Sequence, residues 1–346
     1  MIAVWCLGIG LLLPIAAKLF LGFSPAVYAL SPKQWYYPET AFGRAIADVP
    51  VNRAALIKTP HGDSMDPNEP LYLGVRTVTG FRNPNLRAYH DMYEFHRLIA
   101  EGSLNPEDDF RALAHTGWYL NPSTYPWHVP GTEFRFTEAT RRYLLIHGID
   151  AFITSENLHV AELDWEKVAV ADGLALWKSK NPPPQFLFAS RRTVIPGAIQ
   201  RLVFMLGNGS TWNPLTEAIL AESVPSERHK EEDIPFQATV VEETDGYRLL
   251  AVENSPGGIV TFPAVYDRNW KAYWRDASGA RALSTFASNH AFLGVAVPSG
   301  KGNLEVVFRD KPDRWYWILR GGGVIVFGIF ITAIYKQRKR RVAPAI

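Results

Sequence analysis

The residues whose types suit chemistry lie in short polar clusters in the first half of the chain. Glu107, Asp108 and Asp109 are three consecutive carboxylates directly after Asn105-Pro106. This composition predicts a helix N-terminus, where negative charge meets the positive end of the helix dipole. Metal or sugar binding is the alternative for the same cluster.

A second polar stretch, HGDSMDP, brings His61, Asp63 and Asp66 close together in the sequence. Its glycine and proline predict a turn, and a ligand site is the alternative. His90 and His96 are six residues apart and do not share the i, i+4 spacing of one helix face. We expect both at a surface or an interface.

Two more histidines, His128 and His290, have no evident partner in the sequence and are weak candidates for acid–base work. The chain contains no GxxxxGK[ST], HExxH or GxSxG motif. Cys6 is the only cysteine, which excludes an internal disulfide and a zinc site built from several thiolates. We therefore expect no catalytic residue, no metal and no cofactor. The net charge of +2 argues against a nucleic-acid partner.

The strongest structural pattern in the sequence runs from residue 247 to residue 308. Apolar and polar residues alternate in 258–265 and 303–308, which is typical of half-buried strands. Turn compositions rich in glycine, proline and serine separate these runs. The spacing predicts an antiparallel β-sandwich over residues 235–312.

Three aromatic residues in this region form its densest cluster. Trp270 and Trp274 share strand parity, and Tyr273 points to the other face. We expect Trp270 in the core, because aromatic clusters usually serve burial. The other face is then available to stack on a sugar or to pack on lipid or protein. Trp274 is also a candidate interface or glycan contact.

A small α/β layer is expected before the sandwich, in an extracytoplasmic region of residues 31–200. The patterns predict helices at 40–47, 89–100 and 138–147 and strands at 151–154, 174–177 and 186–189. Gly148 directly follows the third helix, at the C′ position, where glycine commonly adopts the left-handed conformation that ends a helix. Residues 201–234 are interpreted as a connection, with exposed segments at 207–212 and 223–233.

Two apolar stretches flank these regions. Residues 1–30 are long enough to span about 30 Å of hydrocarbon, with a cleaved signal peptide as the alternative. Residues 315–335 are the second predicted transmembrane helix, with aromatic residues at both ends. Its glycines Gly321, Gly322, Gly323 and Gly328 either form a surface for helix packing or reflect the usual glycine content of membrane helices.

A basic tail, residues 336–346, follows the second span. Its positive charges are Lys336, Arg338, Lys339, Arg340 and Arg341. Basic residues beside a span favour the cytoplasmic side, although such a tail could also bind anionic lipid or nucleic acid. With two spans, both termini are then cytoplasmic. The rest of the chain is predicted to lie outside a bacterial inner membrane.

A family resemblance rests on the motifs GGIVTF at 257–262, WKAY at 270–273, AFLGV at 291–295 and PSG at 298–300. This pattern resembles the C-terminal region of the YfhO family of bacterial membrane proteins, and residues 79–93 and 144–154 agree loosely. That family is similar to type C membrane glycosyltransferases, which use lipid-linked sugars and carry many membrane helices before this domain. Their catalytic acids lie in an early extracytoplasmic loop, and only one predicted span precedes the outer region here. The resemblance therefore implies the fold and not the activity.

The sequence thus predicts an α+β membrane-anchored protein in which a small α/β layer and an antiparallel β-sandwich are flanked by two transmembrane helices. Its expected work is non-catalytic: to bind or brace other subunits of a membrane complex. The alternative is the C-terminal or sugar-recognition part of a glycosyltransferase that uses lipid-linked sugars. Expected partners are other membrane subunits, the bilayer, and in the alternative a glycan or lipid-linked sugar. Interface or glycan contacts are expected from Trp35, Tyr36, Trp118, Trp127 and Trp274.

Overall fold

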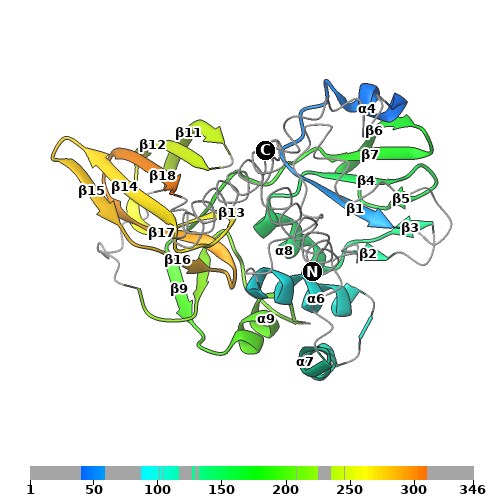
Figure 1. Ribbon diagram of the computed structural model, residues 1–346, viewed down its shortest axis with the longest axis horizontal. Helices are drawn as coiled ribbons and strands as arrows, with labels where there is room; N and C mark the ends of the chain where they lie inside the picture. Colours follow the sequence, from blue (N-terminus) through cyan, green and yellow to red (C-terminus); the bar gives the residue numbers. More distant parts are fainter. Residues whose placement is uncertain are drawn as a thin grey trace, which may run out of the picture. The chain divides into compact units, whose positions relative to one another are not determined.

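The computed structural model describes residues 40–58, 87–100, 102–103, 105–116, 127–128, 132–207, 209–224, 235–244 and 246–309 (Figure 1). The two predicted spans, the basic tail and the HGDSMDP turn lie outside these ranges. Among the described residues, no helix is both long enough and apolar enough to cross a membrane. The chain divides into two compact units. Unit 1 takes residues 1–225, 258–266 and 287–294, and unit 2 takes 226–257, 267–286 and 295–346.

Unit 1 combines helices with a mixed sheet. The helices are α4 (Ala41–Ile46), α6 (Arg87–Ala100), α7 (Pro106–Thr116), α8 (Glu138–His147) and α9 (Ala198–Leu206). The five-stranded sheet has the order β2 (Trp127–His128), β1 (Ala54–Lys58), β4 (Ala151–Ser155), β7 (Leu174–Ser179) and β6 (Trp165–Ala171). Strand β1 pairs in parallel with both its neighbours, and β7 pairs antiparallel with both of its own. A separate two-stranded sheet joins β3 (Glu133–Phe134) and β5 (His159–Val160).

Both faces of the five-stranded sheet are covered, because successive residues of its strands alternate between two apolar clusters. In β1, Ala55 and Ile57 belong to a large cluster that also holds apolar residues of α6, α8 and α9. Ala54 and Leu56 belong to a smaller cluster formed with α4. Helices α6, α8 and α9 also contact one another (Figure 1). Helices thus pack on both faces of this mixed sheet.

Helix α8 shows how local sequence sets an element's limits. Its N-cap Thr137 accepts a hydrogen bond from the Thr140 backbone N–H at 3.0 Å. At the other end Gly148 adopts the left-handed conformation, with φ of 64°. A Cβ atom at this glycine would lie 3.2 Å from the Pro263 ring, so both the backbone conformation and the close approach favour glycine.

A second sheet has six strands in the order β8 (Leu187–Ala189), β13 (Pro256–Val265), β17 (Phe292–Ser299), β16 (Thr285–Ser288), β10 (Glu217–Leu220) and β9 (Arg191–Val194). Strand β9 pairs in parallel with β10, and β13 pairs antiparallel with β8. Unit 1 contains residues 258–266 of the β13 region and 287–294 of the β16–β17 region. These segments are therefore assigned to the same compact unit as the α/β layer.

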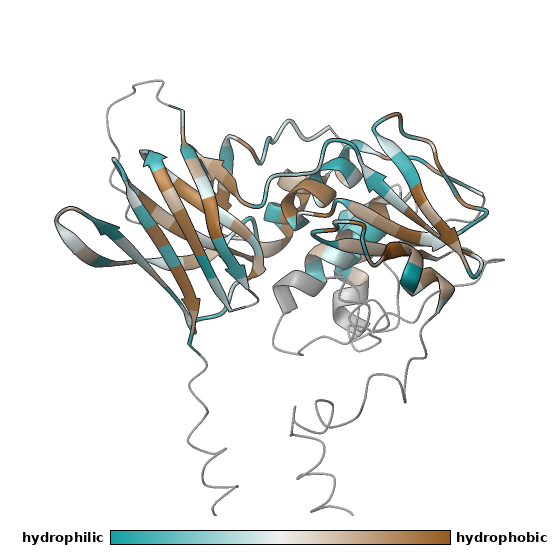
Figure 2. Ribbon diagram, turned by 90° about the horizontal axis from the view of Figure 1, so that it is seen from above, coloured by the Kyte–Doolittle hydropathy of each residue, from teal (hydrophilic) through white to brown (hydrophobic). Residues whose placement is uncertain are grey.

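Unit 2 contains a five-stranded antiparallel sheet in the order β11 (Gln237–Thr244), β12 (Tyr247–Asn254), β18 (Gly302–Phe308), β14 (Trp270–Asp276) and β15 (Gly279–Leu283). Hydrophobic and hydrophilic residues alternate along its strands (Figure 2). The predicted turn between β14 and β15 is present: Asp276 Oδ1 accepts from the Ser278 backbone N–H at 2.8 Å, and Gly279 has φ of 118°.

The predicted helices and strands agree with the structure to within two residues at each end wherever the chain is described. The predicted helix at 138–147 matches α8 residue for residue, and those at 40–47 and 89–100 correspond to α4 and α6. The coarse class, α+β with several sheets, is confirmed. One expectation for residues 201–234 is wrong. Trp212, expected in an exposed segment, is buried in the large apolar cluster of unit 1, where its Nε1 donates to the Glu217 carbonyl at 2.9 Å.

Candidate functional site

The candidate site is one face of the unit 2 sheet, formed by alternate residues of β12, β18 and β14. We call this face the open face, and its central residues are Tyr247, Leu249, Lys271, Tyr273, Arg275, Asn303, Glu305 and Val307. The residues between them, including Leu250, Trp274 and Leu304, point the other way and are buried. Lys271, Arg275 and Asn303 are exposed, and the other five are half-buried. The open face is therefore accessible to a ligand.

Strand register places the two tyrosines near each other on this face. Leu249, Glu305 and Tyr273 form one cross-strand row, and Tyr247, Val307 and Lys271 form the next. Tyr247 on β12 and Tyr273 on β14 are thus separated by the strand β18, and they belong to neighbouring cross-strand rows of the open face. From standard strand spacings, their Cα atoms lie about 12 Å from each other.

The hydroxyl of Tyr247 lies in a negative environment. Partial burial raises the pKa of Tyr247, and the charges of Glu305 and Glu242 raise it further, with Arg275 acting in the opposite direction. Tyr247 therefore stays protonated at neutral pH and can both donate and accept a hydrogen bond.

Arg275 and Glu305 form a fixed polar pair beside the tyrosines. Arg275 Nε and Nη2 donate to the same Glu305 oxygen, Oε2, at 2.9 and 2.6 Å. Arg275 is 55% exposed and Glu305 is 20% exposed. The pair therefore presents a planar guanidinium and a carboxylate to solvent in a defined orientation, suited to a ligand with neighbouring hydroxyl groups.

A second cation borders Tyr273. The Arg309 guanidinium carbon lies 5.6 Å from the centre of the Tyr273 ring, a cation–π distance. Arg309 follows the last residue of β18, and its backbone N–H donates to the Asn269 carbonyl at 3.0 Å. A flat aromatic surface with donors and acceptors along its border can stack on the C–H face of a sugar ring and bind its hydroxyls.

The predicted contact residue Trp274 does not belong to this surface. The structure corrects that expectation: Trp274 is 1% exposed, and its Nε1 donates to Asp276 Oδ2 at 2.9 Å. Trp270 is buried as predicted, and Tyr273 faces the opposite side as predicted. Trp274 shares the strand parity of Trp270, so the argument that placed Trp270 in the core applied to Trp274 as well, and the expected surface contact was inconsistent with it.

The remaining predicted contacts cannot be placed on the open face. Trp127 lies in β2 of unit 1. The others lie outside the described ranges: Trp35, Tyr36, Trp118, Gly321, Gly322, Gly323, Gly328, Lys336, Arg338, Lys339, Arg340 and Arg341.

The acidic cluster is a helix N-terminus, as predicted. Glu107, Asp108 and Asp109 lie in the first turn of α7. Glu107 pairs with Arg111 at 2.6 Å, and Ser103 Oγ donates to Asp109 Oδ2 at 2.6 Å. These carboxylates therefore have hydrogen-bond or ion-pair partners within a few residues of the start of α7. Within the described part of the chain, no group of three or more His, Cys, Asp or Glu residues is arranged to hold a metal ion.

His96 is not at a surface, contrary to expectation. It is 1% exposed and stacks on Tyr143 with ring centres 4.3 Å apart, and Tyr143 stacks on His147 at 3.7 Å. Burial lowers the pKa of His96 to about 3, so its ring is neutral at physiological pH. His147 Nδ1 lies 2.7 Å from the Tyr143 carbonyl, and its ring meets Phe292 edge-on at 4.8 Å. This stack belongs to the core of unit 1.

Comparison with known proteins gives limited matches. No family model and no curated protein matches the chain. Two cryo-electron microscopy structures of arabinofuranosyltransferase AftD from Mycobacteria, one of them a mutant, match it at 23% and 22% identity. The matches cover 31% and 32% of this chain and 8% of each AftD chain, with a TM-score of 0.21 in both cases. The aligned part is thus a small fraction of those proteins, and this TM-score does not establish a shared fold.

Proposed function

We propose that the chain is a membrane-anchored, non-catalytic glycan-recognition module that works beside a membrane glycosyltransferase. The observation that carries the proposal is the open face, where Tyr247 and Tyr273 lie on the two strands beside β18 and Glu305 of β18 is held by Arg275. Neutral sugars carry no charge and have many vicinal hydroxyls. They are recognised by stacking on aromatic rings and by hydrogen bonds from groups that are already held in place.

The composition of the open face favours a sugar over an apolar ligand. Its two aromatic rings each carry a hydroxyl, and charged or amide groups surround them. A stable protein interface of standard size usually has an apolar, fully desolvated centre with few charges. Here Glu305 of the charged pair lies in the same cross-strand row as Tyr273, and Arg275 lies in the next row, on the side away from Tyr247. Binding a glycan leaves such charges partly hydrated and avoids most of the desolvation cost.

Membrane attachment is the second part of the proposal, and it rests on sequence. The apolar stretches 1–30 and 315–335 and the basic tail predict two spans with the outer region between them. The resemblance of residues 257–300 to the C-terminal region of YfhO proteins supports the same setting. Bracing of other membrane subunits remains an expectation from the sequence. The tryptophans and glycines on which it depends are outside the described ranges or have no described side chain.

The experiment is a binding measurement with the full chain purified in mild detergent. We would titrate it with a panel of neutral pentose and hexose oligosaccharides by isothermal calorimetry. At least one should bind, and Tyr273→Ala should weaken that binding at least tenfold because a stacking surface is lost. Tyr273→Phe, which keeps the ring, should retain most of the affinity. Val241→Ala removes a side chain that is 60% exposed on the neighbouring strand β11 and serves as the matched control.

Two results would contradict the proposal. One is that no oligosaccharide in the panel binds to the folded wild-type chain. The other is that Tyr273→Ala binds as tightly as the wild type, which would place the glycan elsewhere. Far-ultraviolet circular dichroism on each variant shows whether the fold is kept.

A further inference from the structure

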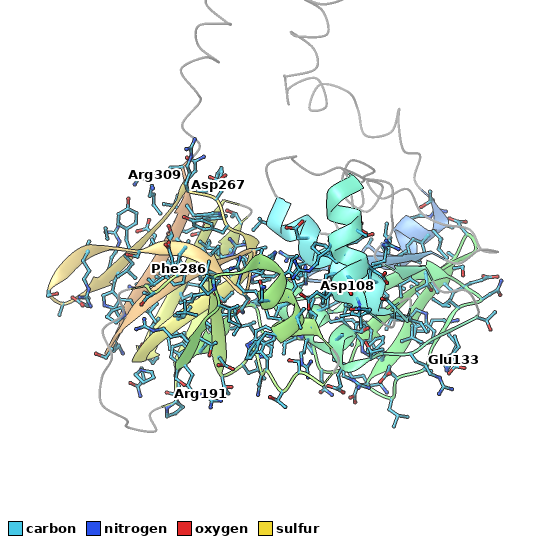
Figure 3. All side chains as sticks on the ribbon, turned by 90° about the horizontal axis from the view of Figure 1, so that it is seen from below. Asp108, Glu133, Arg191, Asp267, Phe286 and Arg309 are labelled. Carbon is cyan, nitrogen blue, oxygen red and sulfur yellow. The ribbon has the colours of Figure 1, made fainter. Side chains whose placement is uncertain are left out.

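One end of unit 2 carries an excess of positive charge. We call it the basic end, and it consists of Arg268, Lys271 and Arg309, all of them exposed. The Arg309 backbone N–H donates to the Asn269 carbonyl at 3.0 Å, and Trp270 pairs with Phe308, so the turn before β14 and the end of β18 lie together. Figure 3 shows the labelled residues Asp267 and Arg309 side by side at this end.

The contacts at the basic end leave its charges available to solvent. Lys271 Nζ donates to the Arg268 carbonyl at 3.0 Å, which uses one of its three N–H groups. The Arg309 guanidinium carbon lies 5.6 Å from the centre of the Tyr273 ring, and Arg309 is exposed.

Asp267 is the acidic residue of the turn before β14, and its Oδ1 accepts the Asn269 backbone N–H at 2.7 Å. Glu242 and Glu243 lie at the same end of the sheet on β11, and Glu243 pairs with Arg248 at 3.4 Å. Among the described residues of the turn, the start of β14 and the end of β18, three exposed cations thus outnumber one carboxylate that is engaged by the turn.

The covalent chain limits how far this end can lie from the predicted second span. Five residues, 310–314, separate Arg309 from Trp315, where the aromatic cluster of the apolar stretch begins. Six extended residue steps reach at most about 20 Å. Tryptophan and tyrosine at the end of a span lie at the headgroup level of the bilayer. The basic end is therefore tethered close to a layer of lipid phosphates.

We infer that the basic end is a docking surface for the headgroups of anionic phospholipids, and that this contact holds unit 2 against the membrane. The inference rests on the membrane anchor in the proposed function and is independent of glycan binding. Each basic residue near an anionic bilayer strengthens association about fivefold, and the effect decays within a Debye length of about 8–10 Å. Arg268, Lys271 and Arg309 together make the docked orientation the dominant one in an anionic membrane.

The opposite end of the same sheet supplies a matched control. Lys301 precedes β18, is 72% exposed, and pairs with Glu253 at 2.5 Å. Seven residues, 302–308, separate it from Arg309, and eight extended residue steps span about 27 Å at strand spacing. This is several Debye lengths, so Lys301 should not respond to lipid charge.

The experiment uses the full chain with Cys6→Ser, which removes its single cysteine, in lipid nanodiscs. A cysteine is placed at either end, as Asn269→Cys or Lys301→Cys, and its rate of labelling by an uncharged polyethylene-glycol maleimide is measured. The discs contain either phosphatidylcholine alone or phosphatidylcholine with about one third phosphatidylglycerol. Labelling at Asn269→Cys should slow at least threefold in the anionic discs, and labelling at Lys301→Cys should not change.

Two further measurements test whether charge is the cause. Adding Arg268→Gln and Lys271→Gln to the Asn269→Cys chain should restore fast labelling in anionic discs, whereas Arg281→Gln with Lys301→Gln should not. Raising the salt to about 0.5 M should restore it without any substitution, which covers the case in which the double variant folds poorly.

Three results would overturn the inference. Labelling at Asn269→Cys could be equally fast in both lipids, or it could slow to the same extent at both ends. The chain could also fail to enter nanodiscs, which would remove the predicted anchor as well. Loss of glycan binding in Tyr273→Ala bears on the proposed function alone, so failures of the two ideas are distinguishable.

Discussion

The aromatic stack inside unit 1 and the open face of unit 2 use the same residue type in opposite ways. In the stack, Tyr143 has a histidine ring on each side, His96 at 4.3 Å and His147 at 3.7 Å. On the open face, Tyr273 is half-buried and its ring meets the Arg309 guanidinium at the sheet end. A tyrosine whose two ring faces are covered contributes to stability, and one with an accessible ring can bind a ligand.

The difference also concerns charge. His96 is neutral at physiological pH because burial makes protonation unfavourable. The Arg275–Glu305 ion pair on the open face lies where water reaches it, with Arg275 55% exposed. Burial thus decides whether a titratable group serves packing or presents charge to a partner. The predictions below test this contrast.

The largest effect is expected at Tyr143. Tyr143→Ala should lower the free energy of unfolding by about 3–5 kcal/mol, because it leaves a cavity between two buried rings. Tyr143→Phe keeps the ring and should cost far less. Urea unfolding of the full chain in detergent, followed by tryptophan fluorescence, measures both. A cost below about 1 kcal/mol for the alanine variant would mean that the stack does not support the core.

A smaller, pH-dependent effect is expected from His96. Its pKa is about 3 in the folded chain and about 6.5 in the unfolded chain. Only the unfolded chain takes up the proton between these values, so stability falls as the pH drops from 6.5 towards 3. Above 6.5 His96 contributes no pH dependence. Between pH 6.5 and 5 the loss should be about 2 kcal/mol.

His96→Phe provides the control for this effect. It keeps an aromatic ring against Tyr143 and removes the ionisable group. Unfolding measured at pH 7, 6 and 5 should therefore show a shallower decline for His96→Phe than for the wild type. Identical declines in the two proteins would show that His96 is already accessible to protons in the folded chain.

The smallest effect on stability is expected on the open face. Arg275→Ala removes an ion pair whose arginine is 55% exposed, and such pairs contribute about 0–1 kcal/mol. The melting temperature should shift by a few degrees at most. A loss of several kcal/mol would assign the pair a structural role and would weaken the case for a binding surface.

Local sequence predicted the elements well where their ends carry specific residues. Helix α8 lies between Thr137, which caps its first turn, and Gly148, which takes the left-handed conformation that ends it. The strands of unit 2 follow alternation and turn composition, so β18 and the β14–β15 turn were also predicted. These features depend on neighbours within a few positions.

The sequence did not predict what depends on distant pairing. Trp274 was expected at a surface and is buried, although its shared strand parity with Trp270 already indicated the core. Tyr247 and Glu305 were not recognised as site residues, because only the pairing of β12 and β14 with β18 brings them together. The alternation of residues within each strand indicates which of them share a face, but it does not identify the strand with which each one pairs.

The discontinuous make-up of unit 1 has a consequence for synthesis on the ribosome. Residues 258–266 and 287–294 complete a unit whose other residues all come before 226. At roughly 5–20 residues per second, about 70 further residues take several seconds to emerge. During this interval the Arg53 guanidinium has its acceptor on His147 available but not its acceptor on Pro263. Until residues 258–266 and 287–294 have been synthesised, unit 1 is incompletely packed. A factor that binds exposed apolar surface could act on the nascent chain during this interval.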